Sequence, residues 1–360
     1  MNAASRTTKT VGTNMKRLIL HLGHPKTAST YLQSVMHLNE EAFLKRGFWI
    51  PSDFEAFGSY NFQSLAATGQ IFSGNLQSLF EAAMNHDSEQ VGRLMDYALR
   101  TDEENVILSS ELLFYYNWVV QEIVQRANDQ NFRVEILVYL ARQDRAVITG
   151  YQQSVRNHGA HGSVVHFLEE HRKQLLFEYA AVIDSYGITS PNRVIVRTFD
   201  PKFLQNGKIC ADFLNLLQCP IDPASLRYPL RDLNTRLPLE WCEILRACNA
   251  ADDTARMEWL RCATPALDPS SRQRSDAYYF REDVRDYVLT HYMADNRDLI
   301  ATYLHDRPLA ERQYWTKMAP ARAGVQLDPR NLADCLAYLH KMPAARASFT
   351  EPLRLVHSIA

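Results

Sequence analysis

The sequence predicts an α/β protein in which a parallel sheet is flanked by helices and followed by a mostly helical C-terminal part. Over the first two hundred residues or so, short continuous apolar runs alternate with amphipathic segments of helical period. Continuous apolar strands of this kind are typical of parallel sheets that are covered on both faces. Beyond that point the apolar residues recur at helical spacing, which predicts helices.

Each element follows from its own pattern. The apolar runs predict strands at Leu18–Leu22, Phe48–Ile50, Val106–Ser109, Val134–Leu140 and Val194–Thr198. Helical spacing predicts helices at Glu89–Arg100, Leu112–Arg126, Ala146–Asn157, Val164–Ser185, Ile209–Leu217, Leu239–Cys248, Asp283–Leu304 and Asn331–Lys341. Because ligands of parallel sheets bind beyond the carboxyl ends of the strands, the turns at Gly23–Thr30, Ser110–Glu111 and Arg142–Asp144 should meet at one cleft.

We expect three regions along the chain. Residues 1–16 are polar and lack a hydrophobic core, which predicts a disordered N-terminal arm and argues against a secretory signal. Residues 17–305 would form the α/β domain. Residues 306–360 would form a helical C-terminal extension whose role, like the oligomeric state, the sequence leaves open.

Composition is that of an ordinary soluble globular protein. The 360 residues are 46% hydrophobic and 22% charged, with a formal net charge of −2. This balance favours neither nucleic acid nor an anionic membrane, and no apolar stretch reaches the roughly 18 residues of a membrane span. The six cysteines form no C-x-x-C pair, which predicts reduced thiols, a cytoplasmic location and no structural zinc.

The most informative segment is RLILHLGHPKTASTYLQ, from Arg17 to Gln33. A predicted strand stops at Gly23, turns through residues 24–27 and enters a helix near Ala28. The free N–H groups and the dipole of a helix N-terminus favour anions such as phosphate. Lys26 adds a positive charge beside them. Hydroxyl donors come from three further residues, Thr27, Ser29 and Thr30. The alternative is a strand–helix turn with a merely solvated lysine.

The spacing argues against an ordinary ATP or GTP site. A Walker A loop has the form G-x-x-x-x-G-K-[ST], whereas Lys26 follows Gly23 by three residues with no second glycine before it.

Two further segments follow predicted strands. Arg142, in the segment VEILVYLARQDRAVITGYQQ, could make a bidentate contact to a phosphate. Thr149 lies two helical turns further on and would reach the same ligand only if the helix starts near Arg142. Alternatively, Arg142 pairs with Asp144 or another nearby carboxylate.

In the segment VILSSELL, Glu111 could act as a general base toward an acceptor hydroxyl. Alternatively, Ser110 caps the next helix and Glu111 is a first-turn acid favoured by the dipole. His21 alternates with strand residues and is predicted to be a packed or hydrogen-bonded core histidine. His24 lies in the turn and could contact the transferred group or the acceptor, which makes it the second candidate for the base; alternatively, it is only a loop side chain.

The first loop resembles the 5′-phosphosulfate loop of sulfotransferases that use 3′-phosphoadenosine 5′-phosphosulfate (PAPS). Bacterial members of the family commonly read P-K-T-G-T-T, and this chain has Ala28 where glycine is usual. The Arg142–Gln153 segment resembles the family's 3′-phosphate-binding strand, Arg-Gln-Asp and Y-x-Q helix, with Thr149 at the serine position. Weaker similarity continues at Arg193–Asp200, Asp212–Leu214 and Asn296–Arg297, so the resemblance covers roughly residues 17–305.

The resemblance implies a P-loop-like fold and transfer of a sulfonate from PAPS to a hydroxyl or amine. Lys26 would neutralise the bridging oxygen, and the loop residues Thr27, Ala28, Ser29, Thr30 and Tyr31 would hold the 5′-phosphate. Arg142 and Thr149 would hold the 3′-phosphate. Glu111 would be the base, or else His24.

Under this reading PAPS is the co-substrate and no metal is required, because the transferred group carries one charge. The expected partners are the nucleotide donor and an acceptor, with a carbohydrate preferred over a lipid or small metabolite. The alternatives are a P-loop nucleotide or small-molecule kinase, which would need ATP and Mg²⁺, and a catalytically silent nucleotide-binding protein.

Overall fold

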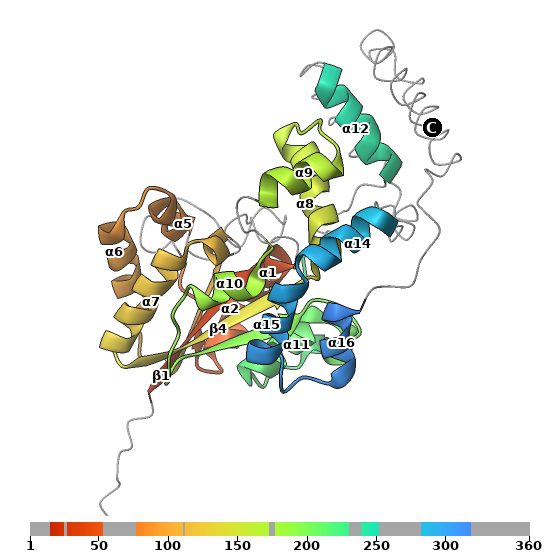
Figure 1. Cartoon of the computed structure of the whole chain (residues 1–360). Helices are drawn as coiled ribbons and strands as arrows, with labels where there is room; N and C mark the ends of the chain where they lie inside the picture. The colour runs from red at the N-terminus through yellow and green to blue at the C-terminus, as the bar shows by residue number, and fades with distance from the viewer. Residues whose placement is uncertain are drawn as a thin grey trace, which may run out of the picture.

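The computed structural model describes residues 15–24, 27–52, 77–110, 112–172, 177–229, 239–251 and 282–317 (Figure 1). Several predicted features lie outside the described residues. They are residues 1–14 of the arm, Pro25, Lys26, Glu111, Cys262, Cys335 and the helix Asn331–Lys341.

Within the described residues, five parallel strands form one sheet in the order β2-β3-β1-β4-β5. The strands are β1 (Lys16–Gly23), β2 (Phe48–Trp49), β3 (Asn105–Ser110), β4 (Phe132–Leu140) and β5 (Arg193–Thr198). The predicted parallel sheet is therefore confirmed, with strand ends within about two residues of those expected.

The strand register brings the predicted site segments to one edge. Leu22 pairs with Ser110, Gly23 with Tyr139, and Leu140 with Thr198. The turns after β1, β3 and β4 therefore begin at the same carboxyl edge of the sheet, as the sequence predicted, and the turn after β5 begins there too. Figure 1 shows α8 (Gln143–His158) and α9 (Val164–Arg172), which follow β4, rising beyond this edge.

Alternation along the strands divides the core between two faces. Ile19 packs with Leu32 of α1 (Ser29–Leu38) and Phe213 of α11 (Ile209–Leu217), beside the short α2 (Glu40–Leu44). Leu18 and Leu20 lie in the larger cluster on the opposite face. That cluster includes side chains of α5 (Gln77–Met84), α6 (Ser88–Leu99), α7 (Asn117–Asp129), α8 (Gln143–His158), α9 (Val164–Arg172), α10 (Tyr179–Asp184) and α12 (Leu239–Ala251).

The C-terminal part is helical, as predicted, and returns to the sheet. It comprises α14 (Glu282–His291), α15 (Met293–Tyr303) and α16 (Leu309–Thr316). Trp315 of α16 is fully buried in the larger core cluster. Short 3₁₀ turns complete the described elements at η1 (Leu112–Tyr115), η2 (Gln205–Gly207) and η3 (Pro223–Ser225).

Three predicted helices were too long. The helix predicted at Leu112–Arg126 is the turn η1 followed by α7, because the backbone breaks at Tyr116 (φ −105°, ψ 70°). The helix predicted at Val164–Ser185 contains the separate helices α9 and α10, and the one at Asp283–Leu304 divides into α14 and α15.

No helix among the described residues is both long and apolar enough to span a bilayer.

Candidate anion-binding site at the carboxyl edge of the sheet

The turn after β1 is closed by its own threonine. The Thr27 hydroxyl donates to the carbonyl oxygen of His24 at 2.6 Å, and the Thr27 N–H donates to the same oxygen at 3.2 Å. Thr27 is fully buried. Of the three hydroxyl residues predicted as loop donors, Thr27 therefore uses its hydroxyl to close the turn.

Ala28 adopts the left-handed conformation, with φ 64° and ψ 23°, immediately before α1. An L-residue with a Cβ in this conformation is strained by about 1–2 kcal/mol, whereas glycine is not. Glycine, which is usual at this position in the loops that the sequence resembles, has no Cβ and adopts this conformation without strain. The chain therefore forms the required turn with a residue that is less suited to it.

The N-terminus of α1 has no side-chain cap and no acidic residue in its first turn. Ser29 is its first helical residue. Its hydroxyl is buried and has no hydrogen-bond partner among the residues that the structure describes. A buried hydroxyl without a partner is costly, and it stands in the first helical turn, whose N–H groups have no partner within the helix. Thr30 is half-buried in the same turn, and Tyr31 stacks on Tyr228 with ring centroids 6.2 Å apart.

The helix that follows Arg142 starts where a shared ligand of Arg142 and Thr149 would require it to start. Helix α8 begins at Gln143, directly after Arg142, so Thr149 does lie two turns beyond that arginine. The Thr149 hydroxyl donates to the carbonyl of Arg145 at 2.7 Å within its own helix. Arg145 in turn pairs with Asp200 at 2.7 Å.

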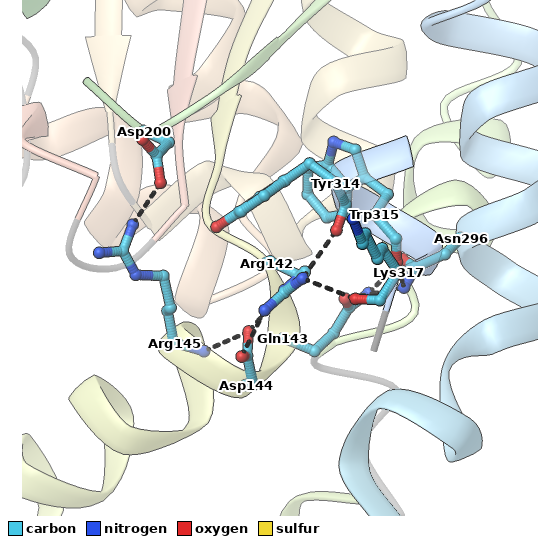
Figure 2. A network of polar contacts seen from close by, with 9 residues as sticks. All are labelled: Arg142, Gln143, Asp144, Arg145, Asp200, Asn296, Tyr314, Trp315 and Lys317. Carbon is cyan, nitrogen blue, oxygen red and sulfur yellow. Dashed lines mark hydrogen bonds and ion pairs between the residues drawn. The ribbon is translucent and has the colours of Figure 1, made fainter. Parts of the chain in front are cut away.

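Arg142 is held in a buried network (Figure 2). Its Nε and Nη2 atoms donate to the two carboxylate oxygens of Asp144, each at 2.8 Å. Its Nη1 atom donates to the carbonyl oxygens of Tyr314 at 2.7 Å and Lys317 at 3.2 Å, and its guanidinium lies 4.5 Å from the Tyr314 ring centroid. The structure therefore shows the ion pair between Arg142 and Asp144 that the sequence analysis gave as the alternative to a phosphate contact.

The participation of α16 in this network was not predicted. Asn296 exchanges two amide hydrogen bonds with Gln143, at 2.7 and 3.1 Å, and donates to the Trp315 carbonyl at 3.2 Å. The Trp315 indole N–H donates to the Thr198 hydroxyl at 2.9 Å. The sequence signalled only Asn296. The expected domain boundary lay before α16, and no local pattern links that helix to Arg142.

A second group that sequence reasoning missed lies between α1 and the sheet. His21 Nδ1 is 2.8 Å from the Ser109 hydroxyl oxygen, which also accepts a hydrogen bond from Gln33 Nε2 at 3.1 Å. All three residues are buried. Burial lowers the pKa of His21 to about 4, so this network is uncharged near neutral pH. The prediction that His21 is a packed or hydrogen-bonded core histidine is confirmed, whereas Gln33, the last residue of the segment RLILHLGHPKTASTYLQ, had no predicted role.

Two further candidates, His24 and Ser110, are both buried. His24 is only 1% exposed, and its ring stands edge-on to Phe114 and Tyr179 at centroid distances of 5.5 and 5.0 Å. The Ser110 hydroxyl is buried without a hydrogen-bond partner in the described part of the chain, so Ser110 does not cap the following turn. No cluster of three or more His, Cys, Asp or Glu side chains arranged for a metal ion occurs among the described residues.

Comparisons with known proteins return little. No family model matches the chain, and no curated protein matches its sequence. One similar solved structure is that of a sulfotransferase from Alicyclobacillus acidocaldarius, with 16% sequence identity and a TM-score of 0.41. The similarity covers 83% of this chain and 99% of that one.

Proposed function

We propose that this chain is a sulfotransferase that moves a sulfonate group from PAPS to a hydroxyl or amine of an acceptor. The observation that carries the proposal is the start of α1. There an uncapped helix N-terminus and the buried, unpaired Ser29 hydroxyl follow a left-handed turn at Ala28. These donors suit the 5′-phosphate of a nucleotide, and their order in the sequence is that of the PAPS loop.

In this proposal the two ends of the nucleotide bind to different strand ends. The N–H groups of the first α1 turn, with the Ser29 and Thr30 hydroxyls, bind the 5′-phosphate, and Tyr31 lies on the same turn. Arg142, directly before α8, and Thr149, two turns further along, bind the 3′-phosphate. β4 is the immediate neighbour of β1 in the sheet, which supports placing both groups along one edge.

The reaction is an in-line displacement at sulfur. The acceptor oxygen or nitrogen forms a bond to sulfur while the bond from sulfur to the phosphate oxygen breaks, and adenosine 3′,5′-bisphosphate leaves with the electron pair. Lys26 stabilises the charge that develops on that leaving oxygen. Glu111 accepts the acceptor's proton. The enclosure of His24 by aromatic rings makes it the less suitable base of the two candidates.

Turnover of PAPS with a panel of carbohydrate, lipid and small-molecule acceptors tests this assignment. Glu111→Gln should lower kcat about a hundred- to ten-thousand-fold while donor affinity stays near wild type, because general base catalysis contributes that order of rate. Lys26→Ala should lower kcat and also weaken donor binding.

The two variants control for each other, because in the proposal Lys26 acts on the donor whereas Glu111 acts on the acceptor. Only Lys26→Ala should therefore weaken donor binding. If kcat of Glu111→Gln stays within about threefold of wild type, Glu111 is only an acid near the start of the following turn. The search for the base then moves to His24.

A further inference from the structure

A guanidinium group offers two edges for a bidentate contact, one formed by Nε and Nη2 and the other by Nη1 and Nη2. In Arg142, Asp144 takes the first edge with both carboxylate oxygens at 2.8 Å. A phosphate that approaches Arg142 in the usual bidentate manner must therefore use the second edge.

At the Nη1 nitrogen, that second edge is occupied by the end of α16. Nη1 donates to the carbonyl oxygens of Tyr314 and Lys317, as Figure 2 shows. These carbonyls belong to the last turn of the helix and to its C-cap, where the helix dipole places partial negative charge. The helix thus puts two negatively polarised oxygens against Nη1, one of the two nitrogens that a bidentate phosphate would use.

Of the two partners, the helix end is the easier to displace. Asp144 is completely buried and also accepts the Arg145 N–H at 3.0 Å. Moving it away from Arg142 would leave a buried carboxylate without its counter-charge, which is strongly unfavourable. The carbonyls at a helix end, by contrast, can accept hydrogen bonds from water once the last turn opens.

We infer that the carboxyl end of α16 is a latch: it closes the phosphate-binding edge of Arg142 and opens when a nucleotide 3′-phosphate binds there. The inference rests on the proposed function and concerns the regulation of the same site. A 5′-phosphate bound at α1 would leave the latch closed.

Specific contacts hold the latch shut. The Trp315 indole N–H donates to Thr198 at 2.9 Å, and the Trp315 carbonyl accepts from Asn296 at 3.2 Å. When only the open form binds a ligand, the apparent dissociation constant rises in inverse proportion to the open fraction. Weakening the latch without touching Arg142 should therefore tighten binding of the 3′-phosphate.

Hydrogen exchange in the full-length protein tests the latch directly. Adenosine 3′,5′-bisphosphate should speed amide exchange in residues 309–317, whereas adenosine 5′-monophosphate, which lacks the 3′-phosphate, should leave it unchanged. Unchanged or slower exchange in this segment with saturating bisphosphate would overturn the latch and leave the proposed function intact.

Thr198→Val provides a second measurement, because it removes the acceptor of the Trp315 indole. It should raise bisphosphate affinity about two- to tenfold, from the usual strength of one hydrogen bond, and leave monophosphate affinity unchanged. Thr101→Val is the matched control. It makes the same chemical change in the segment before β3, at the opposite edge of the sheet, and should alter neither affinity.

The outcomes separate the two claims. Bisphosphate binding that is detectable only in Thr198→Val supports the latch, whereas equal gains for both nucleotides, or no gain, contradict it. Failure of both nucleotides to bind either protein removes the proposed function, and the latch with it. If Thr198→Val does not fold, the exchange measurement on the wild-type protein still decides.

Discussion

At the scale of single residues, Ala28 adopts a backbone conformation that its side chain disfavours. Its φ of 64° lies in the left-handed region, which a residue with a Cβ occupies at a cost of about 1–2 kcal/mol. The turn is nevertheless formed, closed by Thr27 and followed at once by α1.

Ala28→Gly should therefore stabilise the protein. We expect the free energy of unfolding, measured with urea, to rise by up to about 1 kcal/mol, because relief of the strain exceeds the extra entropy of glycine in the unfolded chain. Ala301→Gly, at an exposed helical position in α15, is the control and should destabilise by about 0.5–1 kcal/mol. A loss of stability in both variants would mean that Ala28 is unstrained.

Arg142 has two roles in the account, one structural and one proposed. Its bidentate pair with Asp144 is buried, with side-chain exposures of 5% and 0%. Loss of the arginine alone therefore leaves a buried carboxylate unpaired, so a single substitution would mix loss of binding with loss of stability.

A double substitution separates the roles. Arg142→Met alone should lower the free energy of unfolding by about 3–5 kcal/mol, and Arg142→Met with Asp144→Leu should recover most of that loss. The double variant should still bind adenosine 5′-monophosphate. Its preference for the 3′,5′-bisphosphate should fall by about one to two decades, the worth of a charge-assisted contact. A full preference in the double variant would show that Arg142 does not contact the 3′-phosphate.

At the scale of elements, Asp295 connects α15 to the wall of the candidate site. Its carboxylate accepts the N–H groups of Ala180 and Ala181 at the start of α10, at 3.3 and 3.1 Å. Tyr179 of the same helix contacts the His24 ring and donates to the Ala141 carbonyl at 2.9 Å. Burial raises the pKa of Asp295 to about 6 from its ordinary value of 3.8.

This raised pKa predicts the sign of a pH effect. Between about pH 4 and pH 6 the folded protein binds the Asp295 proton more tightly than the unfolded chain does, so this group's contribution to stability is lost as pH rises through 6. The stability of Asp295→Asn relative to wild type should therefore increase over this range in urea unfolding. Asp298→Asn, at an exposed position on the same helix, should run parallel to wild type. If the free energy of unfolding of Asp295→Asn, relative to wild type, falls as the pH rises, the raised pKa of Asp295 is contradicted.

At the scale of the whole molecule, the strands were predicted well and the helix boundaries less well. Buried parallel strands contain short continuous apolar runs, such as Ile136–Leu140 in β4, and their length fits a strand. The helix predicted at Leu112–Arg126 was wrong at its start because Phe114 and Tyr115 pack on His24 in a separate turn. Such tertiary contacts override local helical spacing.

The candidate site was predicted in its local parts and missed in its long-range ones. The hydroxyl residues and the lysine after the first strand pointed to the start of α1. Arg142 was proposed because it directly follows a predicted strand. The hydrogen bonds from Arg142 to residues 314 and 317, and from Gln33 to Ser109, join positions far apart in the sequence. Neither apolar period nor motif spacing contains that information, so these contacts required the folded structure.

The central claim is that this sheet edge binds a nucleotide with phosphates at both the 5′ and 3′ positions. Isothermal titration calorimetry of adenosine 3′,5′-bisphosphate in EDTA, with ATP and Mg²⁺ titrated in parallel, tests it most directly. The account predicts saturable binding of the bisphosphate without metal and no comparable binding of ATP with Mg²⁺. Binding of ATP with Mg²⁺, together with no heat from the bisphosphate, would contradict the account and favour a kinase.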